Sequence, residues 1–383
     1  MLSELAERLV ASGWGVTVIA GPAEDVPASA YRNGVRVERV PALTFTRAST
    51  LKRGLAYASL YPAFVARALR LPRPDVIVSK TDPPLQLVVS ALLSRVWCVP
   101  AVHWAQDVYP EVAEELGVIA KKGWLAALMR RISTVALHQH ARVVTVGRCM
   151  QERIKARGYP EENTHVVPNW PPASVHPVPH EENAFRAAHG LQDAFVVMYS
   201  GNMGLAHPFD AVLDAAMRLR DTVPDAVLAF VGEGPRKAEL QAQTSERGLQ
   251  NVRFFPYQPF DTLAHSLSAA DVHLVTMQSA LEGLVVPSKL YGVLAAGRPA
   301  LFLGPEGSEA ARVLQDHDCG TVMPEPTGKT LAHKIETWQS NAKRRRAAGR
   351  RARAAVDGAG AQAASSFERI LRACIRGRAV AAS

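Results

Sequence analysis

Short apolar runs rich in β-branched residues alternate along the chain with longer stretches in which apolar residues recur at helical spacing. A first series of such runs comprises GVTVIA, DVIVS, AVHWA, ARVVTV and THVVPN. Strand patterns that alternate with helix patterns are typical of a parallel sheet covered by helices. The pattern therefore predicts an α/β domain, which we place at residues 1–175.

The alternation restarts after a proline-rich stretch, PNWPPASVHPVPHEEN at Pro168–Asn183, which lacks regular apolar spacing and is predicted to be an interdomain linker. The second series of strand-like runs comprises FVVMYS, AVLAFVG, VRFFP, VHLVTM and PALFLG. A second Rossmann-like domain is predicted at residues 176–345, with its ligands at the carboxyl ends of the strands. Its first helix has one apolar face, formed by Phe209, Val212, Leu213, Ala216 and Leu219.

The last part of the chain, residues 346–383, is helical in propensity and begins in a strongly basic stretch. We expect these residues to form terminal helices that pack back toward the first domain. The basic run KRRRAAGRRAR, Lys343–Arg353, has two interpretations. It is either a solvated helix face or a contact for nucleic acid, and the lack of interleaved aromatic residues favours the solvated face. We therefore expect no nucleic-acid partner.

The composition is that of an ordinary globular protein of 383 residues, long enough for two domains. The net charge of +9 favours anionic partners, which include nucleic acid, membrane surfaces and phosphorylated small molecules. The four cysteines lie far apart and do not cluster with histidines, so we expect neither a metal site nor a disulfide framework. A reducing cytosol fits this cysteine usage. No apolar run reaches the length of about 18 residues that would predict a membrane-spanning helix.

Two stretches of the second domain could bind a phosphorylated ligand. In YSGNMGLAHPFD, Gly201 and Gly204 would let the backbone approach a diphosphate, and the helix beyond them would offer free N–H groups. In GLVVPSKLYGVLAAGRP, Lys289 and Ser288 stand at a predicted helix start, with Glu282 just upstream. The alternatives are a tight turn that binds nothing and a simple helix cap with an exposed lysine.

The combination of these stretches is more specific. The G-N-x-G strand end, then VGEGPRKAEL, SAADVHLVTMQSALEG and PSKLYGVLAAGRP, resembles the donor domain of family-4 glycosyltransferases of the GT-B fold. In the first domain, HWAQDVYPEVAEELGVI is similar to the acceptor-side signature of the branch that builds colanic acid and O-antigen type polysaccharides. The resemblance covers nearly the whole chain. It implies two Rossmann-like domains that face a central cleft.

The resemblance also implies an activity. Such enzymes transfer a sugar with retention from a nucleotide-diphosphate sugar, here a UDP-sugar with an N-acetylated amino sugar as one candidate, and need no metal or other cofactor. The acceptor would be a polyprenyl-linked glycan, and the enzyme would be cytoplasmic and peripheral at the inner face of the cytoplasmic membrane. Carried over by residue, the resemblance places the diphosphate on Gly201, Asn202, Gly204 and Lys289, with Ser288 beside it. Glu282 would contact the sugar hydroxyls, and Asp107 would lie across the cleft near the reacting carbon.

The chain departs from the family pattern at several places. Asn202 and His207 stand where many members have arginine and lysine, and His207 is interpreted as a capping or surface residue. Gly292 replaces a second glutamate that usually holds donor hydroxyls. The chain also begins inside the first helix, so the first domain is expected to lack its first strand. These departures keep a second hypothesis open, a catalytically inactive, membrane-associated partner protein.

Two stretches combine basic residues with Trp, Tyr and Leu at helical spacing, Leu51–Arg73 and Lys121–Leu137. Such helices suit shallow insertion into an anionic membrane. The alternative for each stretch is a core-facing helix with a basic outer side.

Overall fold

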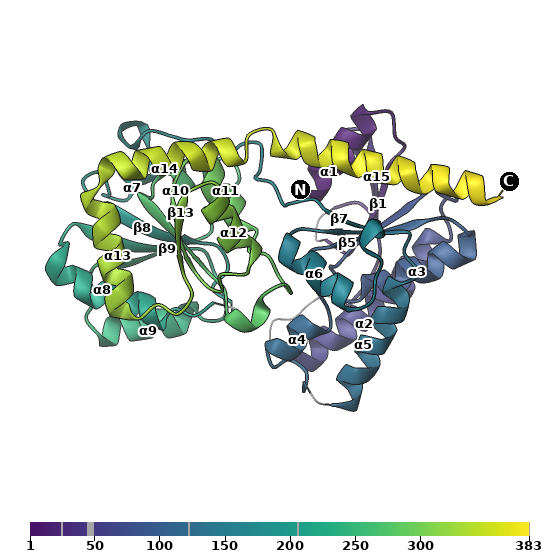
Figure 1. The fold of residues 1–383 in the computed structure, drawn as a ribbon, viewed down its shortest axis with the longest axis horizontal. Helices are drawn as coiled ribbons and strands as arrows, with labels where there is room; N and C mark the ends of the chain where they lie inside the picture. The colour runs from purple at the N-terminus through teal and green to yellow at the C-terminus, as the bar shows by residue number, and fades with distance from the viewer. Residues whose placement is uncertain (24–25, 44–49, 122, 205–206, 383) are drawn as a thin grey trace. The chain divides into compact units, whose positions relative to one another are not determined.

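The computed structural model describes residues 1–23, 26–43, 50–121, 123–204 and 207–382, in two compact units. Unit 1 comprises Met1–Pro168, Gly283–Val285 and Gly360–Ser383, and unit 2 comprises Asn169–Glu282 and Val286–Ala359. Figure 1 shows sheets covered by helices in both units. Leu205 and Ala206 of the predicted glycine loop, and Lys122 of the second membrane-type stretch, lie outside the described residues.

Unit 1 contains two sheets. The first has the order β1-β3-β2 and the second the order β4-β5-β6-β7, in which all neighbours run parallel. The strands are β1 (Thr17–Ala20), β2 (Ser29–Arg32), β3 (Val35–Arg39), β4 (Ile77–Lys80), β5 (Ala101–Ala105), β6 (Arg142–Thr145) and β7 (Thr164–Val166). The helices of the first part of the chain are α1 (Leu2–Ala11), α2 (Thr50–Ala68), α3 (Gln86–Trp97), α4 (Glu111–Glu115), α5 (Trp124–Leu137) and α6 (Arg148–Ala156).

The antiparallel hairpin of β2 and β3 was not predicted. Its turn is Asn33-Gly34, with both residues at positive φ, 48° and 80°. An Asn-Gly pair at positive φ is the preferred two-residue hairpin turn, because its backbone twist matches that of the strands. The dipeptide was therefore the signal for this hairpin. The five strand-like runs of the first series do form strands, as predicted.

Unit 2 is built on one six-stranded parallel sheet with the order β10-β9-β8-β11-β12-β13. Its strands are β8 (Phe195–Ser200), β9 (Ala226–Val231), β10 (Val252–Phe255), β11 (Val272–Thr276), β12 (Ala300–Leu303) and β13 (Gly320–Met323), of which β13 was not predicted. Its helices are α7 (Ala184–Ala188), α8 (Asp210–Thr222), α9 (Lys237–Glu246), α10 (Leu263–Ser268), α11 (Lys289–Ala295), α12 (Glu309–Asp316), α13 (Gly328–Ser340) and α14 (Ala342–Ala355).

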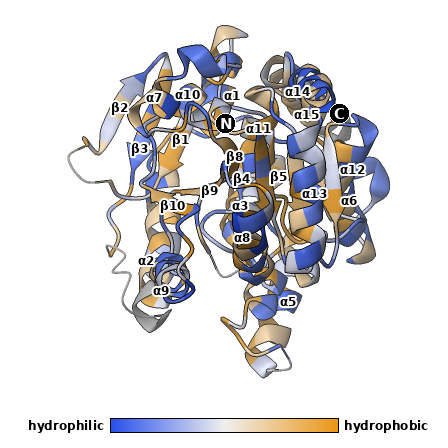
Figure 2. Ribbon diagram, turned by 90° about the vertical axis from the view of Figure 1, so that its left-hand side faces the viewer, coloured by the Kyte–Doolittle hydropathy of each residue, from blue (hydrophilic) through white to orange (hydrophobic). Residues whose placement is uncertain are grey.

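Side chains of β8 alternate between two apolar cores, one on each face of the sheet. Val197 and Tyr199 belong to one cluster, and Val196 and Met198 to the other. Successive strand residues point to opposite faces, so a strand that is covered on both sides is apolar throughout. The face predicted for α8 is confirmed, because the five residues that form it, Phe209, Val212, Leu213, Ala216 and Leu219, are fully buried. Figure 2 colours the core strands orange and much of α8 and α9 blue.

The proline-rich segment contains no strand and only a short 3-10 turn at His180–Glu182. It is nevertheless packed on unit 2, because Trp170, Val175 and Val178 are buried. The Val178 N–H donates to the Ser268 hydroxyl at 3.0 Å. The segment is therefore fixed along most of its length to the second unit.

The terminal helices divide between the units. In unit 2, α14 buries Ala348 and Ala352, and the Arg351 guanidinium on its outer side bonds to Asp318 at 2.7 Å. In unit 1, the ring of Phe367 on α15 (Ala359–Ala382) packs edge-on against Trp104, with centroids 4.8 Å apart. Within the described residues, no helix has the length and apolar character to cross a membrane.

Candidate functional site

The carboxyl ends of β8 and β11 carry the two segments of unit 2 in which the sequence predicted chemistry. The loops after β9 and β12 lie at the same edge of the sheet. Because the strands are parallel, their carboxyl ends lie at one edge of the sheet, where open α/β sheets bind ligands. Any site in this unit is therefore formed by loops that lie far apart in the sequence.

The loops after β8 and β9 contact each other backbone to backbone. The Gly201 N–H donates to Val231 at 2.9 Å, and the Met203 N–H donates to Glu233 at 2.8 Å. Gly232 and Gly234 have φ values of 135° and 151°, which other residues rarely adopt. A Cβ at Gly232 would lie 2.3 Å from the Gly201 carbonyl oxygen, and one at Gly234 would lie 2.5 Å from that of Met203. The V-G-E-G motif thus supports the G-N-M-G loop, a role that the sequence analysis missed.

The glycine loop, rather than a helix end, adjoins the lysine. Helix α8 begins at Asp210, beyond both glycines of the loop. The amides of Gly201 and Met203 are used in the contact with the next loop. Within the described residues, the amides of Asn202 and Gly204 make no backbone hydrogen bond and are the ones left for a ligand.

Lys289 is the first residue of α11, and its side chain runs under the glycine loop. A Cβ at Gly201 would lie 3.2 Å from Lys289 Cε. The Lys289 amine donates a hydrogen bond to the Tyr199 hydroxyl and lies 3.9 Å from the centroid of that ring. Burial lowers the pKa of Lys289 to about 7, because desolvation disfavours the ammonium form. Ser288 is exposed, and its hydroxyl makes no capping bond to α11.

His207 is not the capping or surface residue that the sequence suggested. Its Nδ1 donates to the Thr276 carbonyl at 2.7 Å, and its backbone carbonyl accepts from Arg236 at 2.9 Å. Burial, aided by the nearby Lys289, lowers the pKa of His207 to about 3. The imidazole is therefore neutral at physiological pH and adds no positive charge to the site.

Glu282 lies against the turn between β12 and α12. A Cβ at Gly307 would be only 2.1 Å from Glu282 Oε1, so any other residue at position 307 would displace the carboxylate or the turn. Gly307 thereby leaves the space that the Glu282 carboxylate occupies. The sequence analysis did not single out this glycine, although the G-P-E-G-S turn marks a loop.

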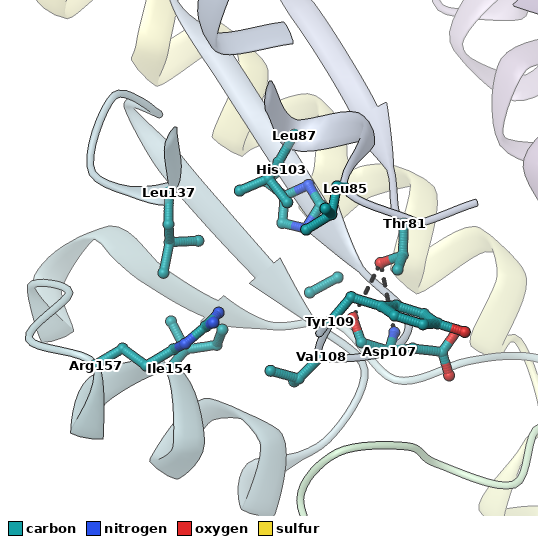
Figure 3. A pocket seen from close by; sticks show the side chains of 11 residues that line it. Thr81, Leu85, Leu87, His103, Asp107, Val108, Tyr109, Leu137, Ile154 and Arg157 are labelled. Atoms are coloured by element: carbon teal, nitrogen blue, oxygen red, sulfur yellow. Dashed lines mark hydrogen bonds between the residues drawn. The ribbon is translucent and has the colours of Figure 1, made fainter. Parts of the chain in front are cut away.

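Asp107 belongs to unit 1, just after β5. The Thr81 hydroxyl accepts from the Gln106 N–H at 2.9 Å and donates to the Asp107 carbonyl at 3.2 Å. Figure 3 shows Asp107 beside the ring of Tyr109, on the opposite side of a small pocket from Arg157. Thr81 therefore fixes the backbone that carries Asp107, and it was missed because it lies on another strand end.

The Asp107 carboxyl has a raised pKa, which brings its titration close to neutral pH. Burial raises the pKa of Asp107 to about 6, and the charge of Asp82 adds to this effect, while Lys80 opposes it. The same pocket is lined mostly by apolar groups from the unit, together with His103. The carboxylate is thus ionised at neutral pH but costly to keep ionised, as in carboxylates that respond to a developing positive charge.

Comparison with known proteins identifies the family. Residues 1–170 match the model of a glycosyl transferase 4-like domain, and residues 181–355 match that of glycosyl transferases group 1. The chain is 30% identical over 344 residues to WcaI of Escherichia coli (strain K12), which is named a colanic acid biosynthesis glycosyl transferase; the match covers 84% of this chain and 83% of WcaI. The chain belongs to the glycosyltransferases. Its resemblance to them, inferred from sequence motifs, is confirmed.

Solved structures of other proteins share the fold of this glycosyltransferase. A sucrose-phosphate synthase from Thermosynechococcus elongatus superposes with a TM-score of 0.73 at 17% identity, covering all of this chain and 93% of that one. Anabaena Alr3699/HepE in complex with UDP-glucose superposes with a TM-score of 0.68 at 17% identity, covering 92% and 99%. The predicted GT-B fold is confirmed by these neighbours and by the two Rossmann-like units.

The structure of this glycosyltransferase gathers some of the predicted site residues and leaves others in separate units. In unit 2, Lys289 lies against Gly201 at the loop that carries Asn202 and Gly204. Glu282 contacts a different loop at the same edge of the sheet. Asp107 lies in unit 1, among residues of that unit. The residues that sequence reasoning missed are Tyr199, Thr81, Gly232, Gly234 and Gly307.

Proposed function

We propose that this glycosyltransferase transfers a sugar, with retention, from a nucleotide-diphosphate sugar to a lipid-linked glycan during synthesis of a cell-surface polysaccharide. The observation that carries the proposal is Lys289. Its amine is buried beside a glycine loop and bonded only to a tyrosine hydroxyl, with no ion pair to it among the described residues. A buried amine without a counter-charge is costly, and a bound diphosphate would compensate it.

The proposed roles follow from the charges that glycosyl transfer creates. As the bond to the diphosphate breaks, negative charge develops on the leaving group and positive charge on the sugar ring. We assign the leaving group to Lys289 and the amides of Asn202 and Gly204, and the sugar hydroxyls to Glu282. Asp107, which is ionised at neutral pH, would stabilise the positive charge on the ring.

The nucleotide and the acceptor are proposed from relatives. The complex of HepE with UDP-glucose makes UDP-sugars the first donors to test, with N-acetylated amino sugars among them. The likeness to WcaI points to a polysaccharide repeat as the product, and hence to a polyprenyl-linked sugar as acceptor. We propose that the reaction proceeds without a metal, because Lys289 and the loop amides supply the charge compensation. Transfer that survives treatment with EDTA would support this point, and transfer that needs added Mg²⁺ would overturn it.

Association with the cytoplasmic face of the membrane is proposed for the outer side of α3 and α5. Along α5, Trp124 is 78% exposed, and Leu128, Ile132 and Val135 are exposed on the same face. Leu92 and Val96 are exposed on α3, which packs against α5. Neither helix contains an acidic residue, whereas Arg95 and Arg131 are exposed. Exposed apolar groups with basic neighbours suit an anionic lipid surface.

The first stretch that the sequence predicted as a membrane contact contains nearly all of α2, and this helix packs into an apolar core. On α2, Leu60, Phe64 and Ala68 are buried, and Tyr57 and Tyr61 pack against the same core cluster. The Tyr61 hydroxyl also bonds to the Pro84 carbonyl. These contacts favour the core-facing interpretation of α2, so the membrane proposal rests on α3 and α5.

A donor screen tests the activity directly. The full chain would be incubated with UDP- and GDP-sugars and a polyprenyl diphosphate sugar as acceptor, and the product's anomeric configuration would be determined by NMR. Transfer with retention from one nucleotide sugar is the expected result. Inversion, or the absence of transfer from every donor despite normal nucleotide binding, would contradict it. The second outcome would favour the alternative of an inactive membrane-associated partner.

Vesicle sedimentation tests the membrane surface. We expect the chain to bind vesicles with anionic phospholipid and to lose most of that binding in an Ile132→Asp, Val135→Asp double variant. Met217→Asp is the matched control, because Met217 is also an exposed apolar residue on a helix, but on α8 of unit 2. Equal loss in the control, or equal binding to vesicles of neutral lipid, would contradict the proposal.

A further inference from the structure

The Tyr199 hydroxyl joins two parts of the candidate donor site. It donates a hydrogen bond to the Asn202 carbonyl at 2.7 Å and accepts one from the Lys289 amine. Tyr199 lies on β8, three residues before Asn202 and 90 residues before Lys289. One hydroxyl therefore links the backbone of the glycine loop to the lysine of α11.

The ring of Tyr199 is itself fixed. It is fully buried and packs edge-on against Phe209, with centroids 4.9 Å apart at 88°. The lysine amine lies over its face, 3.9 Å from the centroid, where a cation is attracted by the ring's negative face. Both contacts to Lys289 thus come from a side chain that has little freedom to move.

We propose that Tyr199 is a positioning residue of the donor site. Its hydroxyl holds both the Lys289 amine and the Asn202 backbone, so that the amine and the glycine loop are already in place when a diphosphate binds. This inference rests on the proposed function, since it assigns the diphosphate to that site. It concerns neither the bond that breaks nor the sugar. Tyr199 acts through Lys289 and does not itself contact the reacting atoms.

The hydrogen-bond directions make the inference testable by pH. Because the single hydroxyl hydrogen of Tyr199 goes to Asn202, its oxygen can only accept from Lys289. An acceptor stabilises an ammonium more than an amine, since hydrogen bonds from charged donors are stronger. Removal of the hydroxyl should therefore lower the pKa of Lys289 below its value of about 7, which burial already sets. A purely structural tyrosine would not have this effect.

The other titratable groups near the lysine do not mimic this effect. His207 faces Lys289 from the loop after β8 and is neutral, because its pKa is lowered to about 3. Arg236, at the start of α9, bonds to the His207 carbonyl and to Glu239. Tyr257, after β10, lies against Gly232. Burial raises the pKa of Tyr199 well above its usual range. Of Lys289, His207 and Tyr199, only the amine of Lys289 should titrate between pH 6 and 8.

The test compares Tyr199→Phe with the unchanged protein, using UDP-glucose as the probe because its diphosphate keeps its charge throughout this range. Calorimetric titrations between pH 5.5 and 8.5 should show binding that weakens by up to about tenfold per unit above about pH 7. In Tyr199→Phe, the onset of this loss should move down by about one pH unit, which leaves binding about fivefold weaker at pH 7 and about tenfold weaker above pH 8. Proton uptake on binding, measured in two buffers of different ionisation enthalpy, should shift in the same way.

Tyr159→Phe is the matched control. Tyr159 is also buried and donates one hydrogen bond to a backbone carbonyl, that of His140, but it lies in unit 1. It should lose similar thermal stability and keep the binding curve of the unchanged protein. If the curves of Tyr199→Phe and the unchanged protein superpose, Tyr199 does not position Lys289.

A ligand-free measurement separates this inference from the proposed function. The rate at which acetic anhydride labels Lys289, followed by mass spectrometry as a function of pH, reports the titration of the amine itself. We expect the titration to move to lower pH in Tyr199→Phe but not in Tyr159→Phe. If no nucleotide binds and the shift is still seen, the proposed function fails and the tie between Tyr199 and Lys289 stands. Identical labelling curves in the unchanged protein and Tyr199→Phe overturn the inference whether or not nucleotides bind.

Discussion

Each unit holds one partly buried ionisable side chain of the candidate site near the end of a strand, and the two groups have opposite charge. In unit 2, burial lowers the pKa of Lys289 to about 7, and in unit 1, burial raises the pKa of Asp107 to about 6. Lys289 is held by another side chain, the hydroxyl and ring of Tyr199. Asp107 is held through its backbone, by the Thr81 hydroxyl.

The two charged side chains are therefore held in two different ways, one by a neighbouring side chain and one through its backbone. A side chain held by a neighbouring side chain keeps its charged atom at a fixed place, which suits a ligand that is charged from the start. A side chain anchored only through its backbone can adjust, which suits a charge that develops during the reaction.

The largest effect is expected for Asp107→Asn. If the carboxylate stabilises positive charge only in the transition state, turnover should fall by about 10²- to 10³-fold while the Kd for the donor changes little. Transfer rates and calorimetric donor binding measure the two quantities separately. The matched control is Asp82→Asn, which removes a nearby exposed carboxylate and should change turnover at pH 7 by less than about threefold. Full turnover in Asp107→Asn would remove Asp107 from the mechanism.

A smaller effect is expected for Lys289→Ala, and it should appear in binding. Loss of a charge-assisted contact of about 1.5–3 kcal/mol weakens nucleoside diphosphate binding by about 10- to 100-fold. Titration of the free nucleotide measures this loss without any transfer. Lys237→Ala is the control, since Lys237 follows β9 of the same sheet but already pairs with Glu233 at 2.6 Å. If Lys289→Ala binds the nucleoside diphosphate with unchanged affinity, the P-S-K turn has a structural role alone.

Glu282 and Gly307 should behave as a pair. Glu282→Ala removes the carboxylate, and Gly307→Ala displaces it, because the added Cβ would meet Glu282 Oε1. Both should weaken nucleotide-sugar binding by about 5- to 10-fold, which is the value of one ordinary hydrogen bond, and leave the affinity for free nucleotide unchanged. Gly54→Ala, at a helical glycine with open space around it, controls for the substitution itself. Weaker binding of the free nucleotide would contradict the assignment of Glu282 to the sugar.

The smallest effect is expected for pH. Asp107 is ionised above about pH 6 and Lys289 is protonated below about pH 7, so kcat/KM for the donor should be highest between these values and fall by up to about tenfold one unit outside them. Lys289→Arg should remove the alkaline limb, because a guanidinium stays charged. Asp107→Asn should remove the acid limb. A profile that is flat from pH 5 to pH 8 would contradict both pKa shifts.

The series of strands was largely predictable because it depends on local patterns. The strand-like runs of both series form strands. The apolar face of α8 is buried, as the spacing of its apolar residues indicated. The hairpin of β2 and β3 was missed although Asn33-Gly34 signalled it, since its strands are short and mostly polar. Strand β13 was missed because GTVM is too short to show a period.

The candidate site was predictable only in part. Motifs identified Gly201, Lys289, Glu282 and Asp107, because each lies at a strand end or helix start that sequence patterns mark. Their partners were not predictable. Tyr199 was one of the apolar positions of a buried strand, and nothing in its surroundings indicated a hydroxyl shared between a loop and a lysine 90 residues away.

The GT-B class, the order of strands along the chain, and the glycines without which adjacent loops could not touch can all be read from the sequence. These follow from periodicity, from motif order and from backbone sterics, which are properties of neighbouring residues. Tertiary structure alone decided the charge states of Lys289, His207 and Asp107. A pKa depends on desolvation and on the groups within a few ångströms, and folding brings those groups together from distant parts of the chain.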